Sequence, residues 1–205
     1  MKFCLFVISV LISLQQLNAQ ATVADTTFVN VRDYSTDLVL DMKYATDKNF
    51  LGTKVYNCAE CFLRHKTVKA LIAANNEVLK KGYRIKLYDC YRPVDVQKKM
   101  WKIVSNPIYV ADPAKGSIHN RGGAVDLTLI DEKGEELDMG TAFDHFGPEA
   151  AHKYKGLTSH IRKNRKLLKK IMLRHGFTAF DSEWWHYNLA GSGKDSLSNF
   201  KWDCD

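Results

Sequence analysis

The sequence lacks a long apolar segment beyond its first nineteen residues, so no later part of the chain is expected to span a membrane. It also lacks internal repeats, low-complexity tracts and any linker long enough to divide it, which argues against a repeat protein or several domains. Aromatic and basic residues do not interleave as single-stranded nucleic-acid binding requires, so no nucleic-acid partner is expected. What remains, residues 20–205, is predicted to be one globular domain with a substantial core.

The N-terminal segment has the features of a secretory signal peptide. Lys2 supplies a positive start, residues 4–14 form a short apolar run, and residues 17–19 offer a small residue for cleavage. We therefore expect cleavage before Gln20, so that residues 1–19 are removed, and export to the periplasm or the extracellular medium. The remaining chain has 29 Lys and Arg against 23 Asp and Glu. This excess is either a solvated basic surface or an attraction for anionic envelope material.

Four cysteines remain after the leader: Cys58, Cys61, Cys90 and Cys204. An even number in an exported chain favours two structural disulfides, with three possible pairings. The Cys-x-x-Cys spacing of Cys58 and Cys61 also fits a redox motif or half of a structural zinc site. The redox interpretation requires the pair to begin a helix just after a buried strand, whereas Tyr56-Asn57 precedes it. A disulfide at Cys204 would restrain a chain end that otherwise frays.

Hydrophobic periodicity predicts helices and short strands that do not alternate regularly. Strands are expected at 28–32, 38–44, 83–88, 123–130, 177–180 and 184–188. Helices are expected at 66–81, at 93–106 with Pro93 in the first turn, and at 157–175, where Gly176 ends the helix. The basic residues of the last helix, Arg165 among them, are expected to form a solvated face. The pattern indicates an α+β domain with a central, mostly antiparallel sheet flanked by helices.

A glycine-rich stretch that leads into the strand 123–130 contains two residues with metal-binding side chains, His119 and Asp126. Asp126 lies on the strand face opposite Val125, Leu127 and Leu129. An aspartate between apolar neighbours must be paired or bind a metal, because burying its charge alone is costly. Taken alone, Asp126 could instead form a salt bridge to Arg121 or a structural hydrogen bond.

The motif Glu183-Trp-Trp-His186 supplies a second histidine and a second carboxylate. Two imidazoles and one carboxylate are a common ligand set for a catalytic zinc that keeps one position open for water. One Zn²⁺ bound by His119, Asp126 and His186 would leave Glu183 as the base that takes a proton from that water. An isolated Glu-x-x-His would more often be a core strand with a hydrogen-bonded histidine. Both halves in one small domain favour a site, and the two tryptophans would raise the pKa of the carboxyl group.

Arg92 is the third element of the predicted site. It lies between a buried strand and a helix, a position that presents side chains at the end of a sheet. An arginine there could stabilise the oxyanion that forms when water adds to a carbonyl, or it could form an ordinary surface ion pair. The other histidines have no ligand partner at a suggestive spacing and are expected to be structural or surface residues: His65, His145, His152, His160 and His175.

Together these residues resemble the zinc D,D-peptidases related to the fold of the Hedgehog signalling domain. Ser117-x-His119-x-x-Gly122-x-Ala124-x-Asp126 with Glu183-Trp-Trp-His186 is similar to the D-alanyl-D-alanine dipeptidase group, the VanX-type enzymes. The similarity extends, in the expected order, to Asp41-Met-Lys-Tyr-Ala-Thr46 with Asn49-Phe50, to Tyr91-Arg-Pro93 and to Asp138-Met-Gly-Thr-Ala-Phe-Asp144. It covers residues 31–187.

The resemblance implies zinc-dependent hydrolysis of D-alanyl-D-alanine. It implies that His119, Asp126 and His186 are the zinc ligands. It further implies that Glu183 is the catalytic base and that Arg92 stabilises the transition state. It also implies a small closed pocket in which Tyr44 and Asp144 hold the free ammonium of the dipeptide, while Ser117 contacts the substrate. A carboxylate facing a blocked amino end would be buried without a partner, which favours dipeptidase over carboxypeptidase action.

Two other functions remain open. A D,D- or L,D-carboxypeptidase acting on peptidoglycan stem peptides would share the site but would need an open groove. A non-catalytic zinc-containing wall-binding domain would have no need of Glu183 or Arg92. The expected export and the extra cysteines differ from the cytoplasmic resistance enzymes of the group, so the expected role is scavenging of the dipeptide during wall turnover. The oligomeric state is left open.

Overall fold

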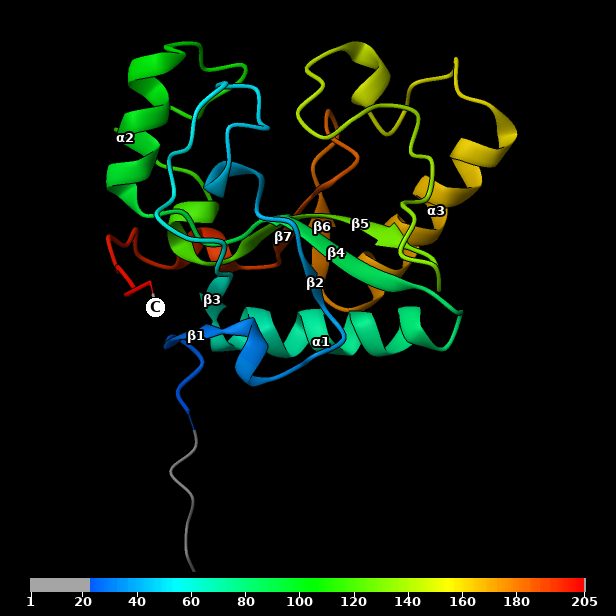
Figure 1. Cartoon of the computed structure of the whole chain (residues 1–205), viewed down its shortest axis with the longest axis horizontal. Helices are drawn as coiled ribbons and strands as arrows, with labels where there is room; N and C mark the ends of the chain where they lie inside the picture. Colours follow the sequence, from blue (N-terminus) through cyan, green and yellow to red (C-terminus); the bar gives the residue numbers. More distant parts are fainter. Residues whose placement is uncertain (1–22, 205) are drawn as a thin grey trace, which may run out of the picture.

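The computed structural model describes residues 23–204, and the predicted signal peptide lies outside them. The strands within this range are β1 (Phe28–Asn30), β2 (Val39–Leu40), β3 (Phe62–Arg64), β4 (Arg84–Asp89), β5 (Ala124–Ile130), β6 (Phe177–Ala179) and β7 (His186–Leu189). The α-helices are α1 (His65–Leu79), α2 (Val94–Ile103) and α3 (Ser159–Arg174). Short turns of 3-10 helix and long loops connect these elements (Figure 1).

A five-stranded sheet with the order β2-β4-β5-β7-β6 forms the centre of the molecule. Its neighbouring strands are antiparallel, except that β2 runs parallel to β4. A second, two-stranded sheet pairs β1 with β3. The structure therefore confirms the predicted α+β fold with a mostly antiparallel sheet.

The helices lie on both sides of the sheet. α1 packs against β4 and against α3, and α3 packs against β6. Figure 1 shows α1 on one side of the sheet and α2 on the other, together with the long loops. Fully buried side chains such as Leu71, Leu127 and Leu168 fill the core, and each such burial contributes about 1.5–3 kcal/mol. None of the helices within residues 23–204 has the length and apolarity to cross a bilayer.

The longer elements follow the prediction, and the shorter ones depart from it. α1 and α3 end before Gly82 and Gly176, whose φ angles of +77° and +84° suit glycine at a helix end. The expected strand 38–44 is wrong over most of its length, because only Val39–Leu40 pairs before a 3-10 turn, Lys43–Ala45, begins. Pro93 lies just before α2 rather than in its first turn. β3 is not among the strands expected from periodicity.

Arg165 is not part of a solvated face, so that prediction is wrong. The residue is only 4% exposed, because its guanidinium contacts the loops that contain Met139 and Ala151. Its Nε donates to the carbonyl of Met139 at 2.6 Å and its Nη1 to that of Ala151 at 3.1 Å. Arg165 therefore donates hydrogen bonds to carbonyl groups of the loops that pack beside the helix. Its neighbours Arg162 and Lys166 are exposed, as expected.

The four cysteines form two disulfides, as predicted. Cys58 is bonded to Cys204, near the C-terminus, and Cys61 is bonded to Cys90. The two cysteines of the Cys-x-x-Cys motif therefore have different partners. This pairing contradicts both the redox and the structural-zinc interpretations of the motif.

Candidate metal centre and active site

Strand pairing places Asp126 and His186 side by side. Asp126 on β5 is paired with His186 on β7, and on its other side with Asp89 at the end of β4. Residues directly opposite in adjacent antiparallel strands point to the same face, with Cβ atoms about 4.5–5.5 Å apart. Oδ1 of Asp126 accordingly lies 2.9 Å from Nδ1 of His186.

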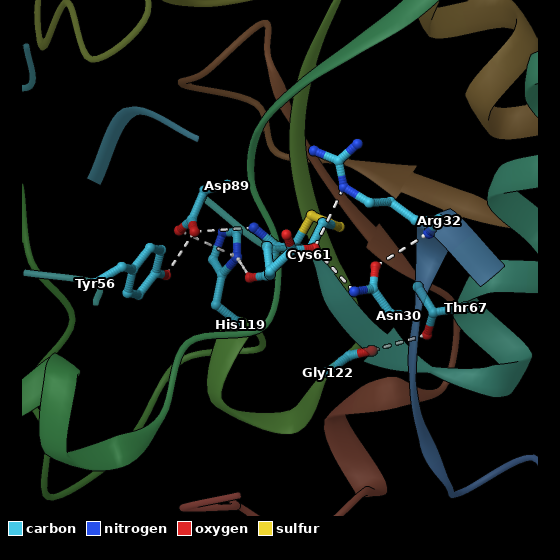
Figure 2. The surroundings of a disulfide bond; sticks show 10 residues. Asn30, Arg32, Tyr56, Cys61, Thr67, Asp89, His119 and Gly122 are labelled. Carbon is cyan, nitrogen blue, oxygen red and sulfur yellow. Dashed lines mark hydrogen bonds and ion pairs between the residues drawn. A yellow bond between two sulfur atoms is a disulfide. The ribbon is translucent and has the colours of Figure 1, made fainter. Parts of the chain in front are cut away.

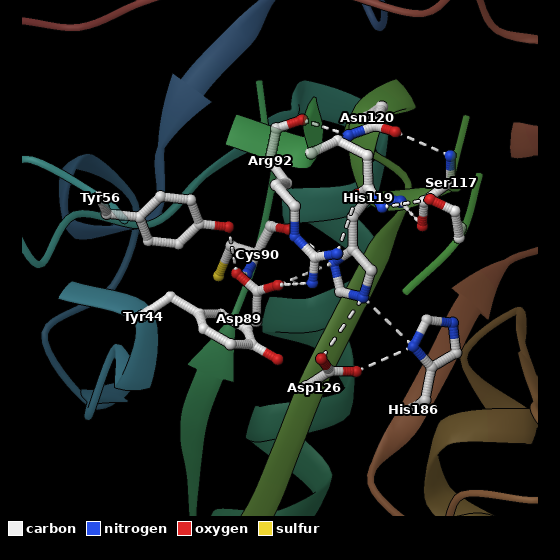
Figure 3. Close-up of polar contacts among 12 residues, drawn as sticks. Tyr44, Tyr56, Asp89, Cys90, Arg92, Ser117, His119, Asn120, Asp126 and His186 are labelled. Carbon is white, nitrogen blue, oxygen red and sulfur yellow. Dashed lines mark hydrogen bonds and ion pairs between the residues drawn. The ribbon is translucent and has the colours of Figure 1, made fainter. Parts of the chain in front are cut away.

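A 3-10 turn, His119–Arg121, brings the second imidazole to the same face. The turn ends at Gly122, whose φ of +69° lies in the left-handed region that glycine adopts without strain. Nε2 of His119 lies 3.2 Å from Nδ1 of His186 and 3.4 Å from Oδ2 of Asp126. One ligand atom from each of the three residues lies within 4.8 Å of the others, and the side chains converge in Figure 3.

The other nitrogen of each imidazole is held by an oxygen that can only accept a hydrogen bond. Nδ1 of His119 donates to the carbonyl of Cys90 at 2.7 Å, and Nε2 of His186 donates to Oδ1 of Asn188 at 2.9 Å. These contacts leave the two converging nitrogens unprotonated in the neutral rings. Metal-binding histidines are usually oriented in this way. The donor set therefore fits a divalent zinc ion, for which two imidazoles and a carboxylate are common ligands.

The two imidazoles of this group favour the ionised form of Asp126. Burial opposes ionisation of Asp126, but His119 and His186 outweigh it and hold the pKa of the carboxyl group below its usual range. Burial likewise opposes a charge on His186, and the nearby Asp126 more than offsets it, so the pKa of the imidazole is raised. The salt bridge to Arg121 that we considered for Asp126 is not formed, because Arg121 donates to the carbonyl of Asp195.

Glu183 lines the same cavity as the three converging side chains. Burial, opposed mainly by His186, raises the pKa of the Glu183 carboxyl group. Trp184 and Trp185 are almost completely buried beside it, so the direction of the shift agrees with the expected effect of an apolar wall. A carboxylate with a raised pKa is better suited to accept and return a proton near neutral pH.

Arg92 is buried at the cavity wall and is not part of a surface ion pair. Its Nη2 donates to Asp89 at 2.5 Å and its Nη1 to Gln97 at 2.9 Å. Asp89 is fully buried and also accepts a hydrogen bond from the hydroxyl of Tyr56 at 2.6 Å. The guanidinium is therefore fixed in place, while its remaining N–H groups are not committed to these partners.

Asp89 and Asn188 are among the site residues that the sequence analysis did not identify. Each had a signal that could have revealed it. Asp89 precedes Arg92 by three residues at the end of a predicted strand, where an ion pair could form. Asn188 follows His186 by two residues in a strand, so both side chains point to the same face.

Tyr44, Asp144 and Ser117, which the resemblance implies to be substrate contacts, all line the cavity. The hydroxyl of Tyr44 donates to Oδ2 of Asp144 at 3.0 Å, and Asp144 has a φ of +60°, in the left-handed region. Burial, and next the charge of Asp126, raise the pKa of Asp144 well above its ordinary value. A cation bound at Asp144 would offset both effects. Ser117 accepts the backbone N–H of His119 through its Oγ at 3.2 Å.

The cavity has a volume of about 380 Å³, near the small end of the range of about 300–1,000 Å³ for ligand pockets. Aromatic side chains that the sequence did not single out complete its wall, including Tyr109, Phe146 and Phe180. The rings of Tyr109 and Phe146 stack with centroids 4.6 Å apart. The size of the cavity favours a small ligand.

The remaining histidines lie outside the cavity lining, as expected. His175 contacts Glu77 at 2.9 Å and His145 contacts Glu149 at 3.1 Å. His65 contacts the carbonyl of Val23 at 2.9 Å. These contacts fit structural roles.

The chain is similar to known proteins over most of its length. A family model described as D-ala-D-ala dipeptidase matches residues 24–202. The chain is 36% identical over 168 residues to a D-alanyl-D-alanine dipeptidase of Escherichia coli (strain K12), covering 82% of this chain and 87% of the relative. It is 31% identical over 170 residues to an Enterococcus faecium protein of the same name, covering 73% and 84%. A structure of VanYB in complex with D-alanine-D-alanine has 16% identity and a TM-score of 0.43, covering 64% of this chain and 74% of that one.

Proposed function

The chain belongs to the D-ala-D-ala dipeptidase family, and we propose that it hydrolyses D-alanyl-D-alanine to free D-alanine with the help of one zinc ion. One observation carries the proposal. The ligand atoms of His119, Asp126 and His186 converge within 4.8 Å, and Glu183 lines the same cavity. A binding domain would need the first three residues but not a base.

The metal would be held by Nε2 of His119, Nδ1 of His186 and the carboxylate of Asp126. When bound, zinc supplies a Lewis acid for the amide carbonyl and lowers the pKa of the attacking water. Cys90 and Asn188 keep the two rings in the required orientation through their hydrogen bonds. The three ligands come from two paired strands and one rigid turn, so the site is formed before the substrate arrives.

Glu183 acts as the general base and then as the general acid. It takes a proton from the attacking water and later delivers that proton to the nitrogen of the leaving D-alanine. Burial raises the pKa of Glu183, so the protonated carboxyl group can persist long enough to return the proton.

Arg92 stabilises the negative charge that develops on the carbonyl oxygen. Its guanidinium is held by Asp89 and Gln97 at the wall of the cavity, so it need not reorganise during the reaction. Fixed donors of this kind are among the largest contributions to catalysis of acyl transfer.

Asp144 and Tyr44 determine the preference for a free dipeptide. The ammonium of the substrate would pair with Asp144, whose carboxyl group otherwise carries a strongly raised pKa in a buried place. An N-acylated peptide would leave that carboxyl group without a cation and would have to fit a cavity of about 380 Å³. Ser117 lines the cavity beside His119 and provides a further substrate contact.

The protein is further proposed to be exported after removal of residues 1–19, and to scavenge the dipeptide released during turnover of the cell wall. Two disulfides support export, because such bonds persist in oxidising compartments and are rare in the cytosol. N-terminal sequencing of the protein recovered from the periplasm or the medium tests this point. A mature protein that begins at Met1 would contradict it.

The activity is tested by measuring D-alanine release from D-alanyl-D-alanine with and without a chelator, followed by zinc replacement. Glu183→Ala should bind zinc and lose most turnover, whereas His119→Ala should lose the metal. An N-acetylated dipeptide should be a poor substrate. Preferential cleavage of the acylated peptide would indicate the carboxypeptidase alternative, and normal zinc content without any hydrolysis would indicate a binding domain.

A further inference from the structure

The Cys61–Cys90 disulfide is fully buried beside the metal centre. Cys61 precedes β3 and Cys90 follows β4, and both have no solvent exposure. The bond therefore ties the small β1–β3 sheet to the five-stranded sheet at the end of β4. Figure 2 shows the disulfide beside Asp89 and His119.

The backbone of Cys90 holds one of the two imidazoles. Its carbonyl accepts the Nδ1–H of His119 at 2.7 Å, and its N–H donates to Oδ1 of Asp89 at 2.9 Å. The first of these bonds decides which nitrogen of His119 faces Asp126 and His186. With the Cys90 carbonyl displaced, the nearest remaining partner of Nδ1 of His119 is Oδ2 of Asp89, at the longer distance of 3.6 Å, so the ring would be held less firmly.

Cys90 lies beyond the regular pairing of β4. The register of β4 on β5 shifts between Leu87 and Asp89, just before Cys90. The following residue, Tyr91, donates its N–H to the carbonyl of Phe62 at 2.9 Å, and Phe62 follows Cys61. The disulfide and this hydrogen bond therefore join the same two segments, one at each side of the Cys90 carbonyl.

We propose that the Cys61–Cys90 disulfide is a positioning element for the metal centre, which holds the Cys90 carbonyl against His119. The inference rests on the proposed zinc-dependent function. Removing a group that orients a metal-bound imidazole typically weakens metal binding by about 10–100-fold. The disulfide thus contributes to zinc affinity in addition to stabilising the fold.

The second disulfide provides a matched comparison. Cys58–Cys204 spans 146 residues of sequence against 29 for Cys61–Cys90, so it constrains the unfolded chain at least as strongly. The Nε1 of Trp202, close to Cys204 in sequence, contacts Sγ of Cys58 at 3.2 Å. Loss of this bond should lower stability without moving the Cys90 carbonyl.

The test uses variants that each lack one disulfide. C61S/C90S and C61V/C90A remove the proposed positioning element, the second with side chains that refill part of the buried volume, and C58S/C204S is the control. Zinc dissociation constants are measured by competition with a chromophoric chelator, with circular dichroism to establish folding. We expect about 10–100-fold weaker zinc binding in both Cys61/Cys90 variants and less than about a threefold change in the control, whatever the changes in melting temperature.

Three results would overturn the inference. A folded Cys61/Cys90 variant that binds zinc within about threefold of the wild type would show that the bond only stabilises the fold. An equal loss in C58S/C204S would attribute the effect to general stability. Failure of both Cys61/Cys90 variants to fold, while the control folds, would make the bond a folding requirement instead. A wild-type protein that binds no zinc would contradict the proposed function itself, so the two failures are distinguishable.

Discussion

Replacement of Asp89 by asparagine tests how the charge of Arg92 is held beside the metal centre. Asp89 is fully buried, and its carboxylate accepts from Nη2 of Arg92 at 2.5 Å and from the hydroxyl of Tyr56 at 2.6 Å. Removing one partner of a buried ion pair costs about 3–5 kcal/mol, because the other charge stays buried without compensation. The amide can still accept from Tyr56 and from the N–H of Cys90, so we expect a loss near the lower end, about 3 kcal/mol.

The loss is measured as the free energy of unfolding of the metal-free protein in urea. A double variant, Asp89→Asn with Arg92→Met, removes both charges and should be more stable than the sum of the two single losses predicts. Turnover of the metal-loaded Asp89→Asn variant should also fall, because Arg92 loses its orientation. An unfolding free energy within about 0.5 kcal/mol of the wild type, or strictly additive losses in the double variant, would refute the reasoning.

Three further predictions concern the base, a half-buried histidine and a glycine. Glu183→Gln should retain zinc and lower kcat by about 10²–10⁴-fold. Because burial raises the pKa of Glu183, the rate of the wild-type enzyme should fall on acidification at a pH above the ordinary carboxyl range. A Glu183→Gln variant whose rate falls over the same acidic pH range would contradict this assignment. Burial, and next Lys169, lower the pKa of His152 to about 4. Between about pH 4 and 6.5 the imidazole is therefore protonated in the unfolded chain but neutral in the folded one. Stability present above about pH 6.5 is lost as the pH falls toward 4. His152→Gln should recover about 1–2 kcal/mol of that loss in urea unfolding at pH 4.5, after allowance for partial exposure, and an unchanged pH slope would count against it. Gly122→Ala would place a methyl group against the ring of Phe28 at a φ of +69°. Its loss of unfolding free energy should exceed that of the control Gly134→Ala, which has open space at a φ of +85° and should lose only about 1–2 kcal/mol from conformational strain. Equal losses in the two variants would show that the clash is relieved.

The three residues of the metal centre could be predicted from the sequence because charged and polar side chains are rarely buried without a binding partner. Asp126 stands between apolar neighbours in a strand, and His119 and His186 belong to two short motifs with polar or aromatic flanks. Asp89 was not predicted although it precedes Arg92 by three residues, because its hydrogen bond with Tyr56, 33 residues away in sequence, forms only in the folded chain. The disulfide pairing is of the same kind, since all three pairings were equally compatible with the spacing.

The fold was predictable where periodicity extends over several turns or residues. α1, α3 and β5 each carry a long pattern, and the structure confirms them. β2 and β3 contain two and three residues, too few for any period to be distinguished. Arg165 was predicted to be a surface residue because the sequence of a basic helix does not show which side chain the neighbouring loops will cover. Carbonyl groups of these loops accept hydrogen bonds from its guanidinium.

We propose that one zinc ion is bound by Nε2 of His119, a carboxylate oxygen of Asp126 and Nδ1 of His186. Anomalous diffraction at the zinc absorption edge, from crystals of the zinc-loaded protein, tests it most directly. We predict one strong peak per chain at the centre of these three atoms, lost in crystals of His119→Ala. A peak elsewhere, or none in a protein that still releases D-alanine from the dipeptide, would contradict the account.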